Sequence, residues 1–252
     1  ARTTFDADSL HYVASVNKSV TSLLVGAAVA AGHLSLDAPL ASFFPEHAEL
    51  LVGGKERIQL SHLLSMSAGL VFDEMGRKPW DGEPSVGDSH GEMDNHPAGP
   101  VRWTLEQPLE AEPGTKFCYN SGLVMVMGEV VARAVGMPLR SWAQQVLFEP
   151  LGIEEWTWWH YPDGTAQAGG GLSLRARDVL KLGILALRGG SWEGREIVPE
   201  DWMAKSTQPQ VPWSEGDAGY FGEQGRHGGG YGWCKVLTLS RFDCAPLANP
   251  EG

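Results

Sequence analysis

The sequence contains little cysteine. Its three cysteines, Cys118, Cys234 and Cys244, are an odd number and include no Cys-x-x-Cys spacing. A disulfide framework uses cysteines in pairs, and a structural zinc site uses closely spaced cysteine or histidine ligands. The cysteines therefore predict neither a disulfide scaffold nor a zinc site.

Basic residues are also scarce, and no long apolar run is present. The 19 Lys and Arg residues against 31 Asp and Glu give a net charge of −12, without a basic run that could follow phosphates. We therefore expect no nucleic-acid partner. The most apolar segment, residues 20–31, is too short and too rich in Ala and Gly to span a bilayer. No leader pattern opens the chain at Ala1, and the cellular location stays open.

The composition is typical of a globular chain with a core. Hydrophobic residues make up 42% of the sequence, which includes 10 Trp, so a sizeable core can form. Ser61 is a plausible N-cap of a short apolar helix. Apolar residues at helical spacing, with glycines at the ends, predict helices at about 15–32, 61–69, 121–136, 138–152 and 175–190.

Two segments differ from this helical pattern. Residues 71–101 are rich in Gly, Pro and acids without a period, which predicts a long surface excursion. Residues 231–239, "YGWCKVLTL", form the only convincing strand pattern.

Ser15 and Lys18 stand at the front of the first predicted helix. Their i and i+3 spacing places them on one helix face. A serine hydroxyl needs a neighbour that takes its proton, and a lysine can do so if burial lowers its pKa. Because Ser-x-x-Lys occurs often by chance, the pair alone favours the other interpretation, a capping serine followed by an exposed lysine.

A second candidate pair follows Pro113-Gly114 in "EPGTKFCYNSG". Tyr119 could pass a proton to a leaving group, because a phenol near an ammonium acts as acid or base. The alternative is a packed tyrosine before a helix for which Ser121, two residues later, is the N-cap.

Four segments in order make the chain similar to a known superfamily. They are the segment around "SVNK" with its following "GHLSLDAPL", then "RIQLSHLLSMSAGL", "EPGTKFCYNSG" and "GGGLSLRARDVLKLGILALRGGSWEGREIVPEDW". Together they resemble the serine β-lactamase and penicillin-binding-protein superfamily, especially its esterases, nylon-oligomer amidases and class C-like enzymes. The agreement runs from residue 5 to 233, and it favours the catalytic interpretation of Ser15 and Lys18.

The resemblance implies roles for these residues. Ser15 is the implied nucleophile and Lys18 its base, Tyr119 relays the proton, and Ser121 contacts the substrate or Lys18. The amide of Ser15 is implied as half of an oxyanion hole. No metal or organic cofactor is implied.

The resemblance also implies a fold and a reaction. We expect one α+β domain over 1–252, β-lactamase/transpeptidase-like, with a mainly helical region at about 15–210 and an incomplete antiparallel sheet. The expected activity is that of a serine hydrolase that cleaves a small-molecule carboxylic ester or amide through an acyl-enzyme on Ser15. An ester ranks first, because Tyr-x-Ser resembles the esterase branch more than the Tyr-x-Asn of β-lactamases. The alternatives are a D-Ala-D-Ala peptidase or β-lactamase, and a non-catalytic, truncated member.

The chain departs from the family pattern at both ends. Only about a dozen residues precede the Ser-x-x-Lys helix, and no Lys/His-x-Gly motif follows Trp233. His227-Gly228-Gly229 has the letters of that third motif but precedes the strand pattern. We therefore expect a truncated sheet with a remnant at about 219–240, an exposed edge or apolar face of the first helix, and self-association.

Two other motifs give rival interpretations. "SMSAG" at 65–69 is one residue from the Gly-x-Ser-x-Gly nucleophile elbow, but Ser67 follows a predicted helix where an elbow follows a strand. "HGEMDNH", with His90 and His96, has acids and histidines in a segment predicted as loop. A solvated acidic loop is the preferred interpretation over a metal site.

Overall fold

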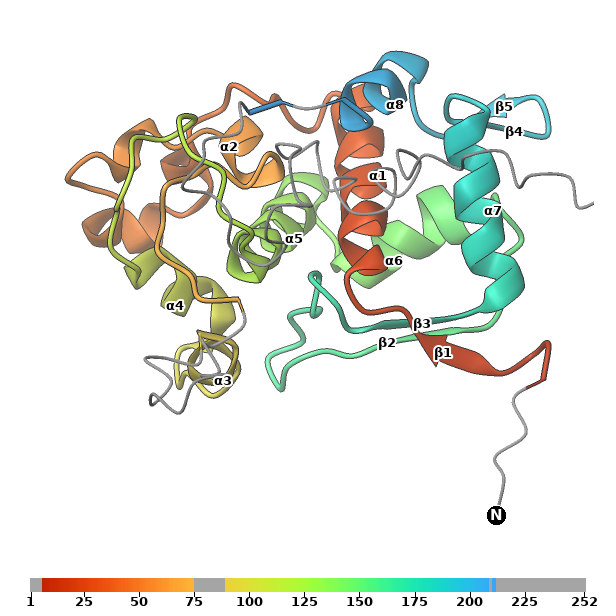
Figure 1. The fold of residues 1–252 in the computed structure, drawn as a ribbon, viewed down its shortest axis with the longest axis horizontal. Coiled ribbons are helices and arrows are strands. Elements are labelled where there is room, and N and C mark those ends of the chain that lie inside the picture. Colours follow the sequence, from red (N-terminus) through yellow and green to blue (C-terminus); the bar gives the residue numbers. More distant parts are fainter. Residues whose placement is uncertain (1–5, 75–88, 209, 212–252) are drawn as a thin grey trace, which may run out of the picture.

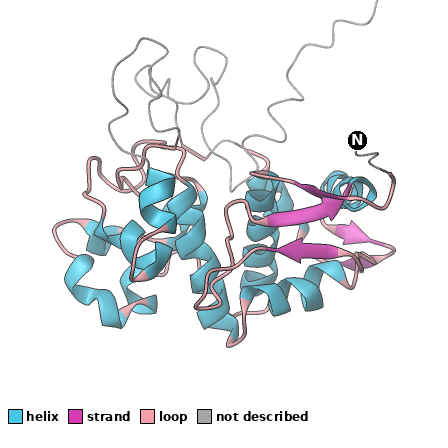
Figure 2. Ribbon diagram, turned by 90° about the horizontal axis from the view of Figure 1, so that it is seen from below, coloured by secondary structure: helices cyan, strands magenta, loops and turns pink. Residues whose placement is uncertain are grey.

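The computed structural model describes residues 6–74, 89–208 and 210–211. In these ranges helices predominate, as the sequence predicts, and the strands gather on one side of the molecule (Figure 2). The elements, shown in Figure 1, are β1 (Leu10–Tyr12), α1 (Val16–Ala30), η1 (Leu40–Phe43), η2 (Pro45–Leu50), η3 (Lys55–Arg57), α2 (Leu60–Leu64), α3 (Ser89–Asp94), α4 (Gly99–Glu106), α5 (Ser121–Val135), α6 (Leu139–Ala143), the π-helical turn η4 (Gln144–Phe148), β2 (Trp156–Trp158), β3 (Leu172–Arg175), α7 (Ala176–Leu187), β4 (Ser191–Trp192), β5 (Arg195–Glu196) and α8 (Glu200–Ser206).

Helix α1 runs through the middle of the structure (Figure 1). It packs against α5 and η4, and the indole nitrogen of Trp142 donates a hydrogen bond to the Leu24 carbonyl over 3.2 Å. The Trp202 ring lies so close to Gly26 that a Cβ there would be 2.6 Å from it. Of the 15 residues of α1, 11 are buried. The expectation that an apolar face of this helix would be exposed is therefore wrong.

The expected small antiparallel sheet is confirmed, but its strands come from other residues than expected. Strand β3 lies between β1 and β2, with Tyr12 opposite Ser173 and Trp158 opposite Leu172. Leu172 and Leu174 point into the core, whereas Ser173 is only half-buried. Strands β4 and β5 form a separate two-stranded hairpin. The described residues thus contain strands where the sequence pattern predicted none. The predicted strand at 231–239, the predicted remnant at 219–240 and His227 lie outside the described residues.

Several predicted helix boundaries are confirmed and others are corrected. Helix α5 ends at Gly136, which has φ 71°, a conformation that glycine adopts without strain. The short helix α2 is capped by Gln59 in a reciprocal pair with His62, and not by Ser61. Asn120, and not Ser121, caps α5 through its side chain. The expected loop over residues 71–101 contains α3 and the start of α4.

None of the described helices alone has the length and hydropathy to cross a bilayer. Helices Ser121–Val135 and Leu139–Phe148 reach these values only as a pair, across a bend of 76°. Most residues of α5 are buried within the protein.

A buried carboxylate fixes the start of α7. Asp178 is fully buried and is bound by Arg175 at 2.7 Å and by Lys181 at 3.0 Å. Burial raises the pKa of the Asp178 carboxyl, but hydrogen bonds from Arg175 and Lys181 outweigh this and hold the pKa below its usual value of 3.8. The carboxylate therefore stabilises the folded protein above the pKa of the unfolded chain, and this stabilisation is lost as the pH falls through the folded pKa.

We expect Asp178→Ala to lower the free energy of unfolding by about 3 kcal/mol at neutral pH, because it leaves two cations without their anion. The loss should shrink in acid. Asp201→Ala is the control, because it removes an exposed i, i+4 pair with Lys205 and should cost less than about 1 kcal/mol. Urea unfolding of both variants measures the difference, and equal losses would contradict the assignment.

Candidate active site

Ser15 stands at the junction between β1 and α1. The residue before it, Ala14, has φ 46°, in the left-handed region that costs a non-glycine residue about 1–2 kcal/mol. Ser15 is the N-cap residue of α1, yet its side chain makes no capping hydrogen bond. The strained turn thus presents the Ser15 hydroxyl at the positive end of a helix, with its oxygen directed to other partners.

Lys18 lies one turn further along α1 and is almost completely buried, with 4% of its surface exposed. Its Nζ donates a hydrogen bond to Ser15 Oγ over 3.1 Å and another to the Gly169 carbonyl over 2.7 Å. The same Nζ lies 5.1 Å from the centre of the Tyr119 ring. Contacts with the Ser15 hydroxyl, the Gly169 carbonyl and the Tyr119 ring therefore fix the position of the amine.

The Gly169 carbonyl is itself held in place by α1. Asn17 Nδ2 donates to the Gln167 carbonyl over 2.9 Å, and Thr21 Oγ1 donates to the Ala168 carbonyl over 2.9 Å. Polar side chains of α1 thus bind three consecutive carbonyls of the segment that leads to β3. Gly169 opens the "GGGLSL" segment of the resemblance, but its role as an acceptor for Lys18 was missed.

Tyr119 completes the contact with Ser15. Its hydroxyl donates to Ser15 Oγ over 2.8 Å, and 9% of its surface is exposed. It comes from the extended segment just before α5, whose start is fixed by the Asn120 cap. The structure therefore brings together Ser15, Lys18 and Tyr119, three of the four residues singled out in the sequence.

Ser121 lies at the first position of α5 and is directed to a carboxylate. Its Oγ donates to Glu74 Oε1 over 2.6 Å, and its amide donates to Glu74 Oε2 over 2.9 Å. Ser121 also lies beside Gly169, whose carbonyl binds Lys18, because a Cβ placed on Gly169 would lie 3.5 Å from the Ser121 Cβ. Glu74 was missed because nothing distinguishes it from the other acids of residues 71–101.

His90, on α3, binds the same carboxylate. Its Nε2 lies 3.2 Å from Glu74 Oε1, and its ring meets the Phe72 ring edge-on at 5.4 Å. The hydrogen bond to Glu74 raises the pKa of His90 above its usual value of 6.5, against the opposing effect of burial. Lys18 is near enough to oppose this rise through its charge. An ionisable pair therefore lies beside the serine site.

The two histidines of the rival metal-site interpretation bind different carboxylates. His96 pairs with Glu106, whereas His90 pairs with Glu74. Within the described ranges no three His, Cys, Asp or Glu side chains are grouped so that they could hold a metal. Ser67 is 1% exposed and its Oγ lies 2.8 Å from Ser65 Oγ. It does not present a hydroxyl at the surface.

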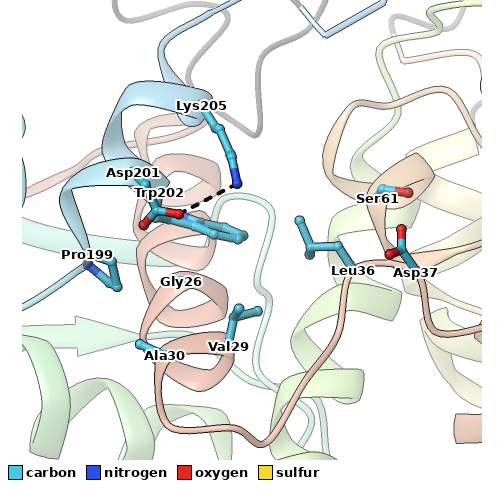
Figure 3. A pocket seen from close by; sticks show the side chains of 10 residues that line it. All are labelled: Gly26, Val29, Ala30, Leu36, Asp37, Ser61, Pro199, Asp201, Trp202 and Lys205. Atoms are coloured by element: carbon cyan, nitrogen blue, oxygen red, sulfur yellow. Dashed lines mark ion pairs between the residues drawn. The ribbon is translucent and has the colours of Figure 1, made fainter.

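A groove of about 480 Å³ opens between α1 and α8, far from Ser15. Figure 3 shows Trp202 at its centre, with Leu36 and Asp37 across the gap and the ion pair between Asp201 and Lys205 at its rim. Gly26 is eight residues beyond Lys18 on α1, about 12 Å along the helix axis. The groove is therefore separate from the hydroxyl cluster.

The chain is similar in sequence to known proteins. A family model described as Beta-lactamase matches residues 1–236. Esterase EstB of Burkholderia gladioli is 33% identical over 161 residues, which are 59% of this chain and 38% of that protein. The 6-aminohexanoate-dimer hydrolase of Paenarthrobacter ureafaciens is 27% identical over 207 residues, 80% of this chain and 52% of that protein. The chain thus spans about two fifths to one half of the length of these curated relatives.

A solved structure is similar in fold. The penicillin binding protein of Bacillus halodurans superposes with a TM-score of 0.66 at 20% identity, covering 92% of this chain and 72% of that one. At this identity the likeness shows the fold alone.

We expect His90 to titrate above pH 6.5, because Glu74 stabilises the protonated ring. Glu74→Gln removes the negative charge and should lower the His90 pKa. Glu112→Gln, which changes an exposed carboxylate bound to Arg57, should leave it unchanged. NMR titration of the histidine rings measures this, and a His90 pKa that is the same with and without Glu74 would contradict the pairing.

Proposed function

Because the chain belongs to the Beta-lactamase family, we propose that it is a serine hydrolase that transfers the acyl group of a carboxylic ester to water through Ser15. The relatives named above are an esterase and an amide hydrolase, which supports hydrolysis as the reaction class. The chain spans only part of their length. The proposal therefore rests on the chemistry of this chain's own residues.

One observation carries the proposal: Ser15 Oγ is contacted by both Lys18 Nζ, at 3.1 Å, and the Tyr119 hydroxyl, at 2.8 Å. Both distances lie within the reach that proton transfer requires. A structural serine needs only one such partner. Two titratable groups on one hydroxyl oxygen match the needs of a nucleophile that must lose its proton and of a leaving group that must gain one.

In the acylation step, Ser15 Oγ forms a bond to the ester carbonyl carbon while its proton passes to the neutral amine of Lys18. The carbonyl electron pair moves to the oxygen and gives a tetrahedral intermediate. When this collapses, the bond to the alcohol oxygen breaks and Tyr119 donates its proton to the departing alkoxide. Lys18 returns its proton to Tyr119, so Lys18 and Tyr119 end the step as they began and the proton of Ser15 has left with the alcohol.

Deacylation repeats these transfers with water as the nucleophile. Water attacks the acyl carbon and gives up a proton to the lysine and tyrosine pair, and Ser15 Oγ leaves with that proton. We assign the backbone amide of Ser15, the N-cap residue of α1, as a donor to the developing oxyanion. One donor of this kind is worth about 2.7–4 kcal/mol of transition-state stabilisation.

An amide is the second candidate substrate. The match to the 6-aminohexanoate-dimer hydrolase covers 80% of the chain, more than the match to the esterase. We rank the ester first because the second motif reads Tyr119-x-Ser121 and because identity to the esterase is higher. Intact-mass analysis after incubation with a penicillin separates a penicillin-reactive protein from both.

We expect a fluorophosphonate to form one covalent adduct, and peptide mapping to place it on Ser15. Ser15→Ala should abolish both the adduct and ester turnover. Ser67→Ala is the matched control, because Ser67 is a buried serine of the rival motif and should keep the label. An adduct on Ser65, Ser67 or Ser121, or none at all, would overturn the proposed function.

We expect Lys18→Arg to lower ester turnover at least about 10²-fold, because a guanidinium stays protonated and cannot act as the base. Lys55→Arg is a matched control: Lys55 is also buried and its Nζ also donates to a backbone carbonyl, that of Leu105, over 2.7 Å. If both variants lose activity equally, the effect belongs to packing. A Lys18→Arg variant with most of its activity would rule out the base.

A further inference from the structure

Two large aromatic side chains lie exposed on the outer face of the three-stranded sheet. Tyr12 of β1 is 67% exposed and Trp159, just after β2, is 51% exposed. Tyr12 pairs with Ser173, and the Trp159 amide donates to the Gly171 carbonyl over 2.8 Å, so both stand on the face that carries Ser173. Figure 1 shows α1, α6 and α7 on the opposite side of the sheet.

Glycines separate the two aromatic side chains. A Cβ placed on Gly170 would lie 3.1 Å from the Tyr12 hydroxyl oxygen, and one placed on Gly171 would lie 3.3 Å from Trp159 Cβ. The Trp159 ring is braced by Tyr161, with ring centres 4.6 Å apart. The segment between the aromatic rings thus carries no side chain of its own, and Gln167 packs against it, because a Cβ on Gly171 would also lie 2.8 Å from Gln167 Cβ.

This aromatic surface is continuous with the reactive serine. Tyr12 precedes Ser15 by three residues, and the position of a Gly170 Cβ is 3.9 Å from the Ala14 carbonyl carbon. Gly169, the next residue, accepts the hydrogen bond from Lys18. An ester whose carbonyl carbon is at Ser15 Oγ can therefore extend one of its substituents towards the exposed rings of Tyr12 and Trp159.

The chemistry of this surface selects an uncharged substituent. The residues next to Tyr12 and Trp159 on this face, Thr157, Gly171 and Ser173, are uncharged. The charged residue of the face, Arg175, stands opposite Leu10 at the other end of β3, with its guanidinium bound to Asp178. Exposed aromatic rings bind flat apolar groups by burial and by ring stacking. A carboxylate or ammonium would lose water there without gaining a partner.

We propose that Tyr12 and Trp159 bind an apolar, preferably aromatic, substituent of the ester that Ser15 attacks, and so set substrate preference. This inference rests on the proposed function. The substituent could belong to the acid or to the alcohol, which present the same chemistry, and the two arms of the experiment distinguish them.

The test measures kcat/KM by acid release for ethyl acetate, ethyl phenylacetate and benzyl acetate. The first is the small reference, the second carries its ring on the acid, and the third on the alcohol. In the double variant Tyr12→Ala/Trp159→Ala we expect at least a tenfold loss for one aromatic ester and less than a twofold change for ethyl acetate. The affected ester identifies the side that is bound.

Two further variants separate recognition from folding. Tyr12→Phe keeps the ring and should keep the aromatic preference, whereas Leu187→Ala removes a side chain that is 86% exposed on α7 and should change none of the three rates. Equal losses for all three esters, no loss for either aromatic ester, or a wild-type protein without aromatic preference would overturn the inference. Fluorophosphonate labelling of Ser15 in every variant keeps this result separate from the proposed function, which fails if Ser15 is not the labelled residue.

Discussion

The burial of the Lys18 amine is the constraint on which the rest of the site depends. An amine taken out of water is costly unless its hydrogen bonds are replaced, and here the Ser15 hydroxyl and the Gly169 carbonyl replace two of them. This requirement explains why the first turns of a helix in the protein core carry Asn17, Lys18 and Thr21 while its later turns are apolar. The polar residues at the start of α1 are therefore what allows an amine to lie in the interior.

The same requirement links the sheet to the helix. The carbonyls of residues 167–169 accept from α1, and the chain then enters β3. Strand β3 pairs with β1, and β1 leads through the strained Ala14 back to Ser15. This closed path fixes the serine at both ends, which is why a costly backbone conformation at Ala14 can persist. A change in the sheet register would move the nucleophile as well.

The sequence predicted those parts of the site that have a local signature. The i, i+3 spacing predicted that Ser15 and Lys18 share a helix face, but their catalytic interpretation needed the resemblance. Tyr119 needed it as well, because no local pattern relates it to a residue 104 positions earlier. The Gly169 carbonyl could not be predicted, since any residue offers the same acceptor. Glu74 lies among other acids. Strands β1 to β3 have only three or four residues, too few for an alternating pattern to be distinguished from a loop.

The glycine segment gives the site two chemically different sides. At Gly169 it adjoins Ser121, whose hydroxyl and amide are bound to the Glu74 carboxylate and through it to His90. At Gly170 and Gly171 it passes between Tyr12 and Trp159, where the neighbouring residues of the sheet face, Thr157 and Ser173, are uncharged. Ser15 lies between these sides. If Ser15 attacks an ester as proposed, one substituent of the carbonyl is directed to an ionisable pair and the other to aromatic rings. In that case the asymmetry orients the ester by the polarity of its two halves, which a symmetric apolar cleft cannot do.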